Sequence, residues 1–154
     1  MTMNQEATQI IANALAQLGL QVPSPMTENL SITLKDQTVL RIDVVDSGKR
    51  VVVWNELLRW PRPEEEAELL ENLLRMHAFG TATQGAAFTA NREAGSVVVF
   101  KSFPSHRLSA DWLAEELESL VALIAQIQAM GKAGQLGGDA AAGQASVGGT
   151  PSFA

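Results

Sequence analysis

The side chains that could do acid–base or metal chemistry in this sequence are two histidines and a few groups of carboxylates. His77 and His106 lack a carboxylate at a fixed spacing that would orient either imidazole as a general base, so we interpret both as surface or helix-end residues. Asp36, Asp43 and Asp46 lack the alternating oxygen ligands of a calcium loop and fit turns and strand ends better. The sequence therefore predicts no catalytic residue and no metal site.

Two clusters of glutamates give no stronger indication of an enzyme. Residues 64–66 are all glutamate, and a second cluster consists of Glu115, Glu116 and Glu118. We expect both clusters in the first turns of helices, where the positive end of the helix dipole favours solvated carboxylates. Sequence motifs of zinc peptidases, P-loops, dinucleotide-binding folds and serine hydrolases do not occur. An enzyme or small-molecule binder is therefore the least favoured class of function, and no cofactor is expected.

Composition excludes further classes. The 154 residues carry a net charge of −6, and the 11 Lys and Arg residues are scattered, which argues against nucleic acid as a partner. No apolar run approaches the roughly 18 residues of a membrane helix, so we expect no membrane insertion. The absence of cysteine and of a basic, signal-like N-terminus fits a cytoplasmic bacterial protein.

The pattern of apolar residues predicts an α+β fold with one domain over residues 1–130. The expected order is helix, three strands, helix, two strands and helix, which favours an antiparallel sheet of five or six strands with three helices. Residues 131–154 contain seven glycines and little hydrophobic content, so we expect a disordered Gly/Ala-rich tail. The predicted elements are a helix over 5–18, strands over 30–34, 39–45 and 51–58, a helix between Pro63 and Gly80, strands over 86–91 and 97–103, and a helix that follows a Ser109 N-cap.

The predicted strands are apolar on both faces, which raises the question of what covers the second face. VVVW, VVVF and VLRIDVV lack the regular polar alternation of a half-exposed sheet. One explanation is that the helices of the same chain cover both faces. The other is that a second subunit or a bound peptide covers one of them. The leucines of the second helix span an arc too wide for one contact face, which favours a dimer.

Over residues 5–130 the sequence resembles the class I chaperones of bacterial type III secretion, the CesT or Tir chaperone family. The segments that carry the resemblance are LAQLGL, LRIDVV, LLENLL and GSVVVFKSFP followed by LSADWLAEELESLV, in this order and spacing. The resemblance implies a homodimer that lacks catalytic activity and binds the N-terminal segment of a secreted effector in extended form. The resemblance also suggests the secretion ATPase as a further partner.

The resemblance supplies no motif of functional residues, so we predict sites from the pattern. We predict effector contact by Ile32, Leu34 and Trp54, because the first strand is short and fits a sheet edge. For the dimer interface we predict Leu69, Leu73, Met76, Val98 and Phe100. A second hypothesis is that the chain is a regulatory or adaptor module of the same fold that sequesters a regulator or a secretion component.

Overall fold

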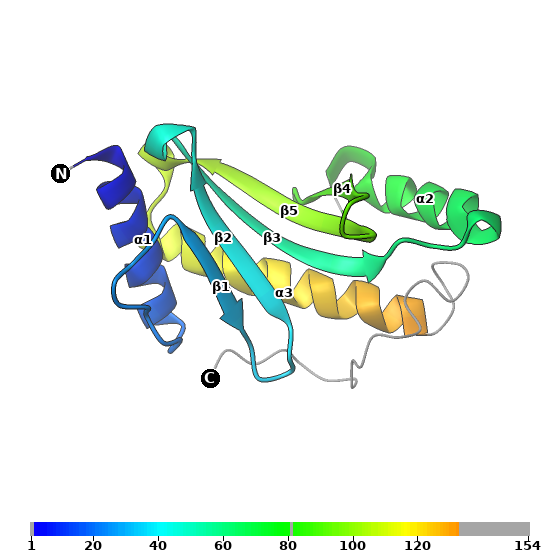
Figure 1. Cartoon of the computed structure of the whole chain (residues 1–154), viewed down its shortest axis with the longest axis horizontal. Coiled ribbons are helices and arrows are strands. Elements are labelled where there is room, and N and C mark those ends of the chain that lie inside the picture. Colours follow the sequence, from blue (N-terminus) through cyan, green and yellow to red (C-terminus); the bar gives the residue numbers. More distant parts are fainter. Residues whose placement is uncertain (1, 81, 133–154) are drawn as a thin grey trace. The chain divides into compact units, whose positions relative to one another are not determined.

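The computed structural model describes residues 2–80 and 82–132 (Figure 1). Within these residues the elements follow the predicted order of helix, three strands, helix, two strands and helix. Most boundaries lie within one or two residues of the predicted ones. The elements are α1 (Met3–Gln17), β1 (Asn29–Thr33), β2 (Val39–Val45), β3 (Arg50–Arg59), α2 (Pro63–His77), β4 (Ala87–Asn91), β5 (Ser96–Pro104) and α3 (Ala110–Lys132), with short 3-10 turns at Asp46–Gly48, Ala78–Gly80 and Ser105–Arg107.

The five strands form one sheet in the order β1-β2-β3-β5-β4, so β1 and β4 are its two edges. The pairs β1/β2, β2/β3 and β4/β5 are antiparallel. This confirms the α+β class and the five-stranded version of the predicted sheet. The described chain consists of two compact units.

The first unit contains residues 2–54 and 101–119. α1 begins with a capping box: Thr2 Oγ1 accepts from the Gln5 amide at 3.2 Å, and the Gln5 side chain accepts from the Thr2 amide at 2.8 Å. α1 lies beside the 46–48 turn (Figure 1) and buries Ile11 and Leu15. In β1 and β2 buried and more exposed residues alternate, because successive side chains of a strand point to opposite faces.

The second unit contains residues 55–100, of which Thr81 is not described, and residues 120–132. α2 starts with Pro63 at its first position and has three glutamates in its first turn, as predicted. It lies beside β4 (Figure 1). Gly95, at φ +66°, forms the turn of the β4/β5 hairpin, and its carbonyl accepts from the Trp60 amide at 2.7 Å.

α3 confirms the predicted N-cap but is longer than expected. Ser109 Oγ accepts from the Trp112 amide at 3.1 Å. The helix continues to Lys132, so Gly131 and Lys132 are helical rather than part of the predicted tail. The rest of that predicted tail lies outside the described residues.

Candidate binding surfaces

The edge strand β1 is the first surface that a partner could use. Among the described strands it pairs with β2 alone, which leaves one side of its backbone open for another strand. The exposed side chains are those of Asn29, Ser31 and Thr33, whereas the predicted contact residues Ile32 and Leu34 are buried, at 9% and 3% exposure. A partner at this edge would therefore meet the backbone around Ile32, and not its side chain.

Trp54, the third predicted effector-contact residue, lies half-buried on a sheet face that we call the open face. This face comprises the half-buried residues Arg41, Asp43, Val52 and Trp54. Trp54 Nε1 donates to Asp43 Oδ2 at 2.7 Å, and the Arg41 guanidinium carbon lies 5.1 Å from the centroid of the indole. These contacts hold the aromatic ring in one orientation on a surface that a partner can reach.

Asp43 is a structural carboxylate. Its Oδ1 accepts from Asn29 Nδ2 at 2.9 Å and its Oδ2 accepts from Trp54 Nε1, so both oxygens hold side chains of neighbouring strands. Within residues 2–80 and 82–132, no group of three His, Asp or Glu side chains is arranged to hold a metal ion.

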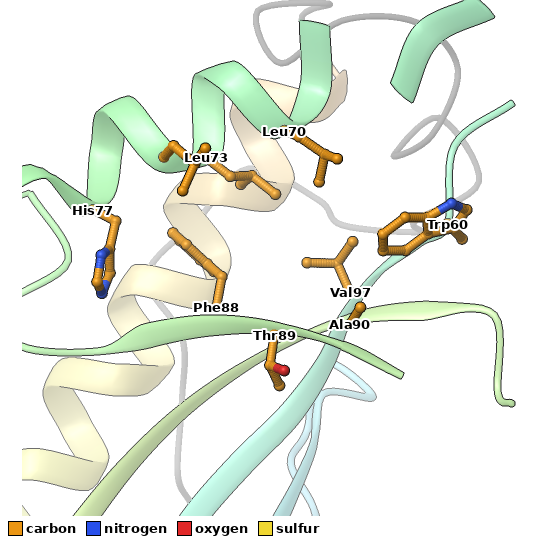
Figure 2. Close-up of a pocket in the computed structure, with 9 residues that line it drawn as sticks. Trp60, Leu70, Leu73, His77, Phe88, Thr89, Ala90 and Val97 are labelled. Carbon is orange, nitrogen blue, oxygen red and sulfur yellow. The ribbon is translucent and has the colours of Figure 1, made fainter. Parts of the chain in front are cut away.

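The second unit carries an apolar groove of about 310 Å³ between α2 and the β4/β5 hairpin. Figure 2 shows Leu73 of α2 facing Phe88 of β4, with Trp60 near one end of the groove and His77 near the other. The His77 ring centroid lies 6.2 Å from that of Phe88. The nine lining residues are Trp60, Leu70, Leu73, Leu74, His77, Phe88, Thr89, Ala90 and Val97.

The structure divides the five predicted dimer residues into two sets. Leu69, Leu73 and Val98 are buried within the chain, at 0%, 3% and 6% exposure, while Met76 and Phe100 are half-buried. Residues 96–99 of β5 are buried in succession without any second chain. The double apolarity of this stretch is therefore satisfied within one subunit, which is the first of the two explanations that the strand pattern left open.

Sequence reasoning did not identify Leu70 and Leu74 as the residues of α2 that line the groove and remain accessible. Leu74 is 71% exposed and Leu70 is half-buried, although both belong to the same arc of leucines as the buried Leu69 and Leu73. The spacing of Leu70, Leu74 and His77 places them on one stripe of α2, next to the buried stripe. That spacing was visible in the sequence, but it did not indicate which stripe faces the chain's own sheet.

The prediction that Glu115, Glu116 and Glu118 lie in the first turn of a helix is wrong, because α3 begins at Ala110, and the predicted solvated role of Glu116 is also wrong. Its Oε2 binds Lys101 Nζ at 2.5 Å, and the Lys101 side chain is only 5% exposed. Glu116 Oε1 accepts from Trp112 Nε1 at 3.1 Å. The carboxylate therefore neutralises a buried ammonium group, because a lysine inside a protein needs a paired opposite charge.

No helix among the described residues has the length and apolarity needed to cross a membrane. His106, the other histidine, belongs to the first unit and follows directly after β5, whereas His77 lines the groove of the second unit.

Comparison with known proteins gives the chain a family. A family model described as the Tir chaperone protein (CesT) family matches residues 9–128. A comparison with curated proteins found no significant match. Solved structures of similar fold confirm the architecture at low sequence identity.

Three of these structures illustrate the similarity. A chain of the HopA1–SchA chaperone–effector complex matches with a TM-score of 0.61 and 16% identity, covering 79% of this chain and 91% of its own length. A chain of the ExsC–ExsE complex has a TM-score of 0.64 and 12% identity, with coverages of 80% and 92%. A chain of the Yersinia pestis secretion chaperone SycH with a fragment of YscM2 has a TM-score of 0.59 and 15% identity, with coverages of 78% and 98%. The family model spans most of the described residues, and the chain therefore belongs to the Tir chaperone protein (CesT) family.

Proposed function

We propose that this chain is a cytoplasmic type III secretion chaperone that binds the N-terminal chaperone-binding segment of a secreted effector in extended form. The observation that carries the proposal is the family match over residues 9–128. One of the similar structures is described as a chaperone–effector complex. Binding of this kind requires no catalytic group and no cofactor, since it consists of holding an unfolded segment.

The effector segment is proposed to use the first unit in two ways. It adds a strand to the open edge of β1, where backbone hydrogen bonds supply affinity with little demand on sequence. Another part of the segment is proposed to contact Trp54 of β3, whose ring is already fixed by Asp43 and Arg41. Ile32 and Leu34 contribute to this site by placing the edge backbone, since their own side chains are in the core.

The homodimer is proposed to form through the apolar groove of the second unit. An exposed leucine beside an apolar groove is typical of a surface that associates with another chain. Of the five predicted dimer residues only Leu73 lines the groove, and Leu69, Met76, Val98 and Phe100 are proposed to contribute to the interface from elsewhere in the second unit. The chaperone and its effector are proposed to dock on the secretion ATPase as a complex.

Affinity purification of the tagged chain from its bacterial host under secretion-inducing conditions tests this proposal. Mass spectrometry identifies the bound proteins, light scattering gives the mass of the complex, and limited proteolysis maps the protected segment. We expect a dimer with one effector chain, protected near the effector's N-terminus, and further recovery of the secretion ATPase after cross-linking. A matched purification with Trp54→Ala should recover less effector.

Two other outcomes would contradict the proposal. Recovery of a regulator or a secretion component in place of an effector would assign the chain to the adaptor class. Recovery of the chain alone, as a monomer, would remove both the effector and the dimer parts of the proposal.

A further inference from the structure

The first unit contains a second hollow, of about 450 Å³, that differs chemically from the apolar groove. Its walls come from the start of α1, the turn between β2 and β3, and the end of β5. The lining residues are Met3, Asp46, Lys49, Arg50, Pro104 and His106. Three of these six residues are basic, in a chain whose net charge is −6.

One wall of the hollow is a turn held in a costly backbone conformation. Asp46, Ser47 and Gly48 have φ values of +51°, +54° and +89°, so three successive residues are left-handed. Such a conformation costs of order 1 kcal/mol or more for each non-glycine residue and persists where surrounding contacts impose it. Here the contacts are close: a Cβ on Gly48 would lie 2.6 Å from the Asn4 amide nitrogen of α1.

The Arg50 side chain and the backbone of Lys49 are also held in place. Arg50 Nε and Nη2 donate to Ser102 Oγ at 3.0 and 2.8 Å, which fixes the guanidinium plane on β3 and leaves three of its five N–H donors for other acceptors. The Lys49 carbonyl accepts from the Ser105 amide at 2.8 Å, which ties the turn to the segment that carries His106. The backbone segments that carry Lys49, Arg50 and His106 are therefore tied to one another.

The charges of the hollow match a single carboxylate. Among the described lining residues, Lys49 and Arg50 supply two permanent positive charges and Asp46 supplies one negative charge. With His106 counted as neutral, the net formal charge is about +1, which one carboxylate neutralises.

We propose that this hollow binds a glutamate side chain from an acidic segment of a protein partner. The carboxylate lies between Lys49 and Arg50, and the methylene groups of the glutamate pack on Met3 and Pro104. The proposal is independent of the chaperone function, because it concerns a different surface and a ligand that can be tested in isolation.

Titration of the ¹⁵N-labelled full chain with a blocked triglutamate peptide tests the proposal, with a triglutamine peptide and inorganic phosphate as comparison ligands. We expect saturable amide shifts in the 46–50 and 104–107 segments with triglutamate. Lys49→Gln should weaken binding roughly two- to fivefold, the usual effect of one exposed charge pair. Lys35→Gln, which removes an exposed lysine from another turn, is the matched control and should leave the affinity unchanged.

Three results would overturn the proposal. Shifts that map outside the hollow, or that Lys49→Gln leaves unchanged, would remove the site. Equal binding of triglutamine would remove the role of the carboxylate. Tighter binding of phosphate than of triglutamate would reassign the hollow to phosphate. The thermal unfolding midpoint of each variant verifies that the fold is intact before titration.

Discussion

Single charged residues in this chain hold neighbouring elements together. Asp43 joins side chains of β1 and β3 across the open face, and Glu116 joins Lys101 to Trp112. The second network is the more deeply placed, since the Lys101 side chain is 5% exposed and that of Glu116 is 25% exposed. Removing one partner of an ion pair at such depth destabilises the fold, because the remaining charge stays buried without an opposite charge.

We predict that Glu116→Gln lowers the free energy of unfolding by about 3 kcal/mol, because it leaves the Lys101 ammonium group buried without its counter-charge. The glutamine side chain can still accept from Trp112, so the loss reports on the charge. Replacing Lys101 by Met in the same variant should restore most of the stability. Urea unfolding measures all three proteins. Glu118→Gln, at an exposed position of the same helix, should change stability by less than about 0.5 kcal/mol.

At the scale of elements, the 46–48 turn decides where α1 lies in the first unit. α1 packs on this turn, and Gly48 is buried against the first turn of the helix. No larger residue fits, because a Cβ would lie 2.6 Å from backbone atoms of both Met3 and Asn4. The glycine is therefore required by a close approach of two backbones as well as by its positive φ.

We predict that Gly48→Ala destabilises the chain by about 3 kcal/mol, which combines the strain of a left-handed alanine with a clash between backbones. Gly95→Ala is the matched control, because Gly95 also has a positive φ, +66°, but nothing lies within 4 Å of the position that a Cβ would take there. That variant should lose about 1 kcal/mol. Urea unfolding gives both values, and hydrogen exchange should show faster opening of α1 in Gly48→Ala. Equal losses in the two variants would contradict the importance of the close approach.

At the scale of the whole molecule, the apolar groove beside α2 is the surface that indicates association. Leu74 is 71% exposed at its rim, and the groove is lined mainly by leucines and aromatic rings. Leu73, one residue away, is 3% exposed and belongs to the core of the chain. Adjacent leucines of one helix thus serve different purposes, so substitutions at the two positions separate association from folding.

We predict that Leu74→Glu converts the proposed dimer to monomer and changes the free energy of unfolding of that monomer by less than about 0.5 kcal/mol, since the side chain is exposed in a single chain. Leu73→Ala should cost about 3 kcal/mol of stability. Light scattering gives the mass, and urea unfolding gives the stability. Glu68→Lys, at an exposed position on another face of α2, should leave the dimer intact. A Leu74→Glu protein that keeps twice the chain mass would place the interface elsewhere.

The sequence by itself determined the class and order of the elements. Local signals were sufficient, such as Pro63 at the start of α2, Ser109 at the cap of α3 and the alternation in β2. Each of these signals depends on a few neighbouring residues in the sequence, so it can be recognised without knowing which other segments the element packs against. The family resemblance could likewise be stated from the order of short segments, and the family match confirms it.

The tertiary structure alone decided which apolar residues are covered. Leu69 and Leu74 read alike in the sequence, and their exposures differ because α2 packs only one side against its own unit. The ion pair of Lys101 with Glu116 and the hollow around Lys49 were also visible only in the tertiary structure, since both join residues from separate elements. Burial and charge pairing depend on distances between segments far apart in the chain, and periodicity along the sequence does not carry those distances.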